Sequence, residues 1–189
     1  MKDAAERAEK TELLDKLFSY LAERELENIT IREVCKGTGI VQGTLYYWFG
    51  DKTTIICECA EYGLQKVTDE IFQYVFANMR ELKRFFSVCL DKIDTYKNEL
   101  RFMYQMAASP VYGEKIRAKA NNFSYIYNQY AVELAEALHC DADILRPLVR
   151  LFISAVLDYV IWEEREATQM QLDFIYSSLA EKLSLKKGA

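Results

Sequence analysis

The chain has 189 residues, of which 51% are apolar and 13% aromatic, and its formal net charge is −5 at pH 7. This length accommodates one domain or two small ones with a buried core. Seven glycines and two prolines are too few for a barrel or sandwich with many tight turns, and the net charge excludes a polybasic surface for non-specific nucleic-acid binding.

The cysteines and the histidine do not form the pattern of a metal centre. His139 is the only histidine, and the five cysteines lack the spacing of zinc ligands, so we expect no metal and no cofactor. We expect reduced, packed thiols in a cytoplasmic protein, with a redox-sensing cysteine as the alternative. No basic, apolar segment precedes a cleavage-type site, so secretion is not expected. The longest apolar run, 148–162, is too short to span a bilayer, so no membrane association is expected.

Helical periodicity begins near the start of the chain. Apolar residues recur at helical spacing and predict a first helix over about residues 4–25. Thr30 followed three residues later by Glu33 is the pattern of a capping box, which predicts a short second helix starting there. Gly39 then supplies a residue able to take positive φ, and Ile40 plugs the turn that follows.

The next stretch, GIVQGTLYYWFGDK, contains four adjacent aromatic residues. Leu45, Tyr46 and Phe49 have the spacing of the buried face of a third short helix. Four consecutive aromatics cannot all point inward from one helix. The pattern therefore predicts that Tyr47 and Trp48 lie on the exposed side.

The remainder of the chain also has helical periodicity and no strand pattern. Gly50 ends the third helix, and Asp51 caps a fourth that begins at Lys52 and extends to about residue 75. The fold class is therefore predicted to be all-α, with about nine helices. The later helices are predicted near residues 82–93, 99–108, 116–138, 148–162 and 172–183.

A capped helix, a glycine turn and a second short helix together predict a helix-turn-helix unit, whose second helix enters the major groove of DNA. Gln42 can bond an adenine edge in two places, and the methyl group of Thr44 suits a thymine methyl. Gly43 removes a side chain where the backbone would approach the DNA. The alternative is an ordinary helical corner whose aromatics fill a core. The expected phosphate contacts are Tyr47, Trp48 and Lys52.

The segment TIREVCKGTGIVQGTLYYWFGDKTTI resembles the DNA-binding signature of the tetracycline-repressor (TetR) family of bacterial regulators. With the first helix included, the resemblance covers about a quarter of the chain, and the remainder is similar only in length and helical character. The matching positions are Thr30, Val34, Gly39, Gly43, Leu45, Tyr46, Trp48, Phe49 and Lys52.

The resemblance implies an all-helical homodimer with two domains. Residues 1–51 would form a three-helix DNA-binding domain, in which Thr30 is a further candidate DNA contact. Residues 52–189 would form an effector-binding and dimerisation domain with helix 52–75 as connector. The last two helices of each subunit would form a four-helix interface. Ligand binding would shift the connector and release the operator.

Two positions depart from the family pattern. Val41 stands where the family often has a serine or threonine and cannot cap the third helix, and Trp48 replaces a more usual histidine or tyrosine. Residues 1–52 carry eight Lys or Arg and ten Asp or Glu, a net charge of −2. We therefore expect a salt-sensitive dimer with few phosphate contacts.

The larger domain contains candidates for an effector pocket and for a dimer interface. A small, apolar or aromatic effector would suit the pocket candidates, which can also be read simply as core. The helix over 148–162 is apolar on most sides, which favours packing against a partner. The pocket candidates are Phe86, Cys89, Phe102, Met106, Phe123, Tyr127 and Phe152, and the interface candidates are Leu151, Ala155, Tyr159, Phe174 and Ser178.

The function expected is that of a ligand-responsive transcriptional regulator, a repressor that binds a palindromic double-stranded operator as a homodimer. An enzyme is the rival class, but the chain has one histidine and no G-x-S-x-G, H-E-x-x-H or phosphate-loop motif, so no enzymatic activity is expected. The other alternative is a co-regulator of the same fold that acts through a protein partner and contacts DNA weakly.

Overall fold

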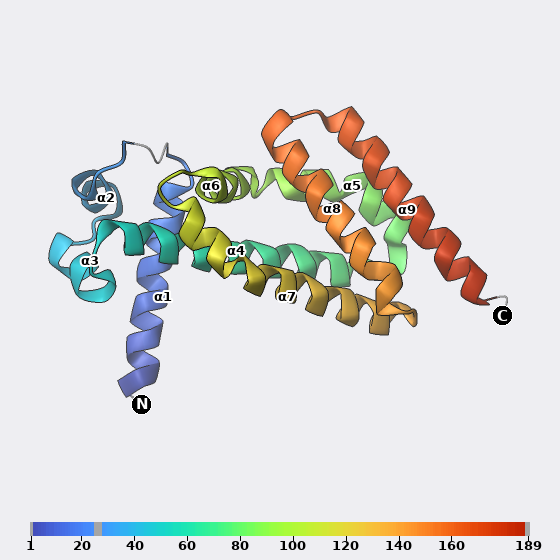
Figure 1. Ribbon diagram of the computed structural model, residues 1–189, viewed down its shortest axis with the longest axis horizontal. Helices are drawn as coiled ribbons and strands as arrows, with labels where there is room; N and C mark the ends of the chain where they lie inside the picture. Colours follow the sequence, from blue (N-terminus) through green and yellow to red (C-terminus); the bar gives the residue numbers. More distant parts are fainter. Residues whose placement is uncertain (1, 25–27, 188–189) are drawn as a thin grey trace. The chain divides into compact units, whose positions relative to one another are not determined.

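The computed structural model describes the backbone of residues 2–24 and 28–187 and the side chains of residues 5–24, 28–116, 118 and 127–183. Within these ranges the chain forms nine α-helices and one 3₁₀ helix, with no strand, which confirms the predicted all-α class (Figure 1). The elements are α1 (Lys2–Leu21), α2 (Ile31–Thr38), α3 (Gln42–Phe49), α4 (Lys52–Ala77), η1 (Met79–Glu81), α5 (Leu82–Asp94), α6 (Lys97–Ala108), α7 (Gly113–Leu138), α8 (Ala142–Trp162) and α9 (Arg165–Lys187).

The helices pack as two compact units. Unit 1 comprises Met1–Thr68 and Asn98–Ala118, and unit 2 comprises Asp69–Lys97 and Lys119–Ala189. These units describe packing, and the functional boundary between residues 51 and 52 stays a prediction. Within the described residues, no helix has both the length and the apolar character needed to cross a membrane.

The core of unit 1 forms where α1 packs on α4 and α6. The rings of Phe18 and Phe102 meet edge to face with centroids 5.8 Å apart. Gly63 of α4 makes room for this packing, because a Cβ atom there would lie 2.1 Å from Cε2 of Phe18. The predicted first helix extends too far: α1 ends at Leu21, its last buried apolar residue, and the N–H of Arg24 donates to the Leu21 carbonyl in a tight turn.

Polar contacts also hold α1 against α4. Nζ of Lys10 lies 2.6 Å from a carboxylate oxygen of Glu58. One turn further along α4, the hydroxyl of Tyr62 donates to Oδ1 of Asp15 at 3.1 Å, and Lys66 donates to the same oxygen. The Lys66 hydrogen bond is the main reason that the pKa of Asp15 lies below its ordinary value, against a smaller opposing effect of burial.

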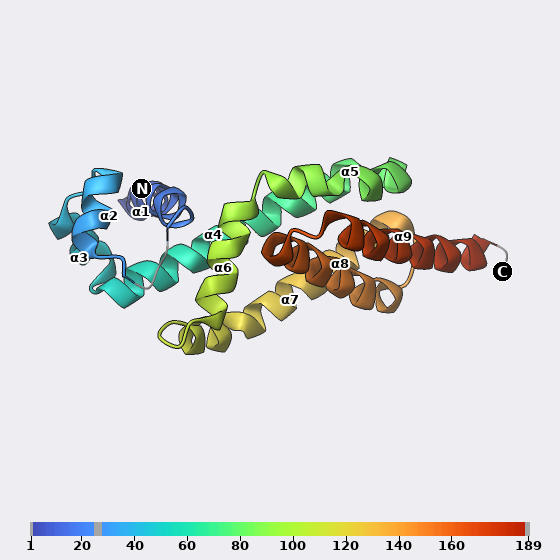
Figure 2. The same cartoon turned by 90° about the horizontal axis from the view of Figure 1, so that it is seen from above.

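Unit 2 is built on the α8–α9 hairpin, whose helices lie side by side in both views (Figures 1 and 2). Asp141 caps α8 by accepting a hydrogen bond from the N–H of Asp143, so α8 begins earlier than the predicted residue 148 and includes Pro147. α5 packs on this hairpin, where the ring centroids of Phe86 and Phe152 lie 6.1 Å apart.

A polar cluster fixes α5 to the hairpin. The hydroxyl of Tyr159 donates to Oδ1 of Asp94 at 2.7 Å, and Arg165 donates to the other oxygen of Asp94 at 3.0 Å. Arg165 also pairs with Asp91. The pKa of Tyr159 is raised, first by burial and then by its hydrogen bond to Asp94. Tyr159 is therefore part of the interior of unit 2.

Candidate nucleic-acid interface

The start of α2 is fixed by the predicted capping box. The backbone N–H of Thr30 donates to Oε2 of Glu33 at 2.8 Å, and the N–H of Glu33 donates back to the Thr30 hydroxyl at 3.2 Å. The hydrogen bond from the Thr30 backbone lowers the pKa of Glu33, which keeps the carboxylate ionised. The Thr30 hydroxyl also donates to Glu33, so its hydrogen bonds are made within the chain.

The turn between α2 and α3 has the predicted chemistry. Gly39 adopts φ +72°, and its N–H donates to the Cys35 carbonyl at 2.9 Å, which ends α2. Ile40 is buried beneath the turn. Val41 precedes α3 and its side chain does not cap the helix, while its carbonyl accepts hydrogen bonds from the N–H groups of Thr44 and Leu45.

α3 buries one narrow face. Leu45 and Phe49, one turn apart, are buried, whereas Tyr47 is 81% exposed. The prediction that Tyr46 anchors this helix is wrong, because Tyr46 is 40% exposed. Its side chain lies about 100° around the helix from Leu45, beyond the arc that faces the neighbouring helices. Trp48 is half-buried rather than fully exposed and meets the ring of Tyr47 edge to face, with centroids 5.5 Å apart.

The N-terminal edge of α3 is open. Gln42 and Gly43 are exposed, and Thr44 is half-buried. A Cβ atom built on Gly43 would have no heavy atom within 4 Å, and Gly43 does not have positive φ. Nothing in the described structure therefore requires glycine at position 43, neither close packing nor backbone conformation.

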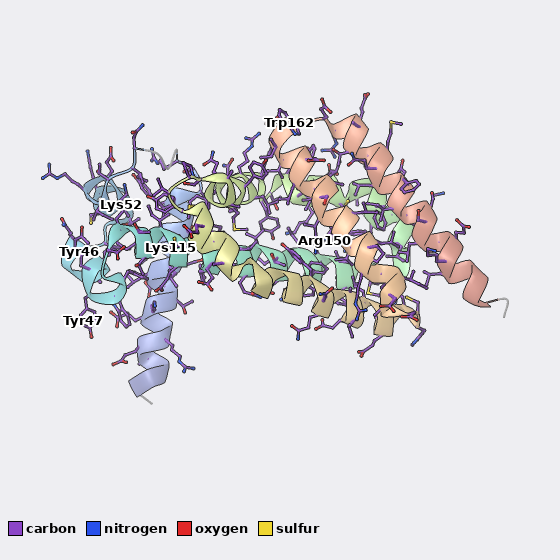
Figure 3. All side chains as sticks on the ribbon, viewed as in Figure 1. Tyr46, Tyr47, Lys52, Lys115, Arg150 and Trp162 are labelled. Carbon is purple, nitrogen blue, oxygen red and sulfur yellow. The ribbon has the colours of Figure 1, made fainter. Side chains whose placement is uncertain are left out.

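The start of α4 adds charge beside α3. Asp51 accepts a hydrogen bond from the N–H of Thr54 at 2.8 Å, which is the main cause of its lowered pKa, and the cation of Lys115 contributes to the same shift. Lys52 is half-buried and Lys115 is exposed. Figure 3 labels both lysines together with Tyr46 and Tyr47, and all four belong to unit 1. No sequence motif connects Lys115, which lies on α7, with α3, so sequence reasoning missed it.

Unit 2 contains a partly open cavity of about 60 Å³ whose lining is entirely apolar. This volume is well below the roughly 300 Å³ of a typical small-molecule pocket. The lining residues come from α4, α5, α7, α8 and α9. They are Phe72, Val75, Leu82, Phe85, Phe86, Leu134, Leu138, Leu145, Leu148, Val149, Phe152, Ile175 and Leu179.

The structure brings only part of the predicted effector site together. Phe86 and Phe152 line this cavity. Cys89 is buried and Tyr127 half-buried in unit 2, but neither lines it. The others lie elsewhere: Phe102 and Met106 are buried in unit 1, and the side chain of Phe123 lies outside the described residues.

The predicted interface residues divide into two groups. Leu151 and Phe174 are exposed, and Ser178 is half-buried. Ala155 and Tyr159 are buried inside unit 2. Of the predicted interface residues, only Leu151, Phe174 and Ser178 are therefore accessible to a partner subunit.

The cysteines and acidic residues show no metal-ligating arrangement in the part of the chain that is described, where no three His, Cys, Asp or Glu side chains are placed to hold an ion. None of the five cysteines, all of which the structure describes, forms a disulfide. Burial raises the pKa of Cys59, and it raises the pKa of Cys89 to about 12. These thiols are therefore held in their unreactive neutral form.

Comparison with known proteins adds no relative: no family model, curated protein or solved structure matches the chain.

Proposed function

We propose that this protein is a ligand-responsive transcriptional regulator similar to the TetR family, a repressor that binds a palindromic operator as a homodimer. The N-terminal edge of α3 would enter the major groove, and a small apolar effector bound in unit 2 would release the DNA. The TetR-like signature at residues 30–55 motivates this function, and local geometry of unit 1 supports it.

The single observation that carries the proposal is the open edge of α3. Gly43 lacks a side chain at a place where the chain itself leaves room for one. Glycine costs about 1 kcal/mol relative to alanine inside a helix, so its presence without an internal reason favours an external surface that approaches the backbone. Gln42 is exposed on the same edge and is suited to an adenine.

The surroundings of α3 favour specific contacts over general electrostatic attraction. Tyr47 is almost fully exposed and carries a phenol that can donate to a phosphate. Lys52 is the first residue of α4, and its ammonium group can bind a phosphate as a point charge. Glu33 and Asp51 place negative charge close by, so the number of phosphate contacts is expected to be small.

The effector site proposed is the apolar cavity of unit 2. Its walls offer no hydrogen-bonding group, so they suit an uncharged, apolar ligand. The cavity is small, and a ligand of ordinary size would have to displace its walls. Such displacement couples binding to conformation only if the ligand prefers the state that does not bind DNA.

The proposal is tested by selecting duplexes from a random DNA pool at two salt concentrations. We expect a palindrome whose half-sites are one helical turn, or a multiple of it, apart. The logarithm of the affinity should fall with the logarithm of salt concentration with a slope that corresponds to few contacts. A slope of about −9 or steeper, which indicates ten contacts or more, would contradict the electrostatic part of the proposal. Failure to enrich any sequence at low salt would contradict the function itself.

A co-regulator that binds a protein partner is the second candidate. It is favoured by the exposed apolar side chains of Val41, Tyr46 and Tyr47, which resemble the aromatic centre of a protein interface. DNA binding that requires a second protein from the same cell would support this candidate over the first.

A further inference from the structure

One exposed strip of α8 is complementary to itself. Its five members are spaced four residues apart, so each is turned by about 40° from the one before and only the inner three, Arg150, Ser154 and Asp158, share an arc of about 80°. All five are exposed. Cations occupy its N-terminal half, serine its centre, and an acid and an indole its C-terminal half. The members of this α8 strip are Arg146, Arg150, Ser154, Asp158 and Trp162.

The two inner charges of the α8 strip lack partners among the residues that the structure describes. Arg150 and Asp158 are eight residues apart, so they are separated by about 12 Å along the helix axis and cannot pair with each other. Among the side chains that the structure describes, neither forms an ion pair or a hydrogen bond. Arg146 differs, because it pairs with Asp143 one turn earlier on the exposed surface.

We propose that two copies of this chain associate through antiparallel α8 helices that cross at Ser154, so that Arg150 of each faces the partner subunit's Asp158. A twofold axis at residue 154 makes a position before Ser154 face the equally distant position after it. This inference rests on the homodimer of the proposed function and adds its register.

Apolar side chains beside the α8 strip provide the surface that association would bury. Leu151 is exposed on α8, and Trp162 is 71% exposed at its end. Met170 and Phe174, one turn apart on the adjacent α9, are also exposed, and Phe174 is 67% so. Burial of this surface would supply most of the affinity, whereas the two charge pairs would determine the alignment of the helices.

The charge pattern also opposes other alignments. A parallel pair in register would set Arg150 against a second Arg150 and Asp158 against a second Asp158. Like charges that face each other across an interface weaken association in that alignment. The antiparallel arrangement about Ser154 instead places each inner charge of the strip, Arg150 and Asp158, opposite a charge of the other sign.

Charge reversal with sedimentation equilibrium tests this register. Arg150→Glu and Asp158→Arg should each weaken dimerisation by about tenfold or more, since each creates two repulsive contacts. The double variant restores both pairs in the opposite sense, and its dissociation constant should return to within about threefold of the wild-type value. Lys83→Glu on α5 makes the same change in charge at an exposed position off the strip and should leave dimerisation unchanged.

A cross-link provides a second measurement that does not depend on electrostatics. Antiparallel helices packed 8–10 Å apart, with Cα atoms about 2.3 Å from each axis, bring the two residues on the twofold axis within disulfide reach. Ser154→Cys, in a background with Cys35 and Cys140 replaced by serine, should therefore give a covalent dimer under mild oxidation. Ser87→Cys, exposed on α5, serves as the control and should not.

The outcomes separate this inference from the proposed function. Three results would overturn the register alone. Dimerisation could be unaffected by both single reversals, the folded double variant could fail to regain the wild-type dissociation constant, or the Ser154→Cys protein could fail to cross-link. A wild-type chain that stays monomeric at tens of micromolar would overturn the homodimer as well. Circular dichroism of each variant checks that the helices are intact.

Discussion

Replacing Gly43 with alanine should make the protein more stable and a poorer DNA binder. The added methyl group meets no heavy atom within 4 Å, so it introduces no clash. Alanine is better than glycine in a helix by roughly 1 kcal/mol, and Gly43 is the second residue of α3, so the gain in unfolding free energy is at most about that amount. For a chain of this size the melting temperature should rise by about 2–4 °C.

The loss in DNA affinity follows from the same methyl group. If the backbone at position 43 lies against DNA, a Cβ atom there displaces the helix edge and weakens the neighbouring base contact. One good contact of that kind is worth about 1–3 kcal/mol, so the dissociation constant should rise by about fivefold or more. Thermal unfolding followed by circular dichroism and fluorescence anisotropy with a labelled operator measure the two effects on one sample.

Gly63→Ala is the matched control. It is the same substitution in a helix, but its methyl group would lie 2.1 Å from the Phe18 ring. Overpacking of this kind usually costs about 1–3 kcal/mol, so this variant should be destabilised. A Gly43→Ala protein that binds the operator with unchanged affinity would refute the placement of α3 against DNA. One that is destabilised would refute the structural reasoning about the open edge.

Three further predictions concern the units themselves. Thr30→Ala removes the cap of α2 and should lower the unfolding free energy by about 1 kcal/mol, as measured by urea denaturation. Asp15→Asn should destabilise the protein at neutral pH but not in acid: the lowered pKa of Asp15 contributes stability above its unfolded value of 3.8, and this is lost as pH falls through the folded pKa. The wild type and the Asp15→Asn variant are melted in parallel between pH 7 and 3, and a difference in melting temperature that stayed constant with pH would refute this. Thiol labelling of the native protein at pH 8 should modify the half-buried Cys35 and Cys140 first and leave Cys59 unmodified until unfolding, and equal rates would contradict the assignment of burial.

The helix ends and turns from α2 to α4 could be predicted from the sequence, because residues close together in the chain determine them. The capping box of Thr30 and Glu33, the positive φ of Gly39 and the cap at Asp51 each depend on residues within three positions of one another. These features were read correctly from the sequence because no distant part of the chain is needed to form them.

Burial depended on tertiary packing and was predicted less well. Tyr46 has the sequence spacing of a core residue, yet α3 buries an arc too narrow to include it. Phe102 has the character of a pocket residue, but α6 packs into unit 1 and places it against Phe18. The periodicity of a helix shows which face is buried but not which other helix packs against that face. A pocket formed by several helices could therefore not be predicted from the sequence.

The position of Lys115 near Asp51 could not be predicted from the sequence either. It lies on α7, far along the chain from Asp51, and only the packing of unit 1 brings it close enough to affect that carboxylate. The candidate site could therefore be predicted from the sequence, whereas the charges that surround it could be identified only in the structure.

The central claim is that the N-terminal edge of α3 reads DNA sequence. It is tested most directly by comparing the duplexes selected from a random pool by the wild type and by Gln42→Ala. We expect both proteins to recover a palindrome. We expect the variant to lose its preference at one base pair, an adenine, in each half-site while the other positions are retained. Identical sequences from the two proteins, or no enriched sequence from the wild type, would contradict it.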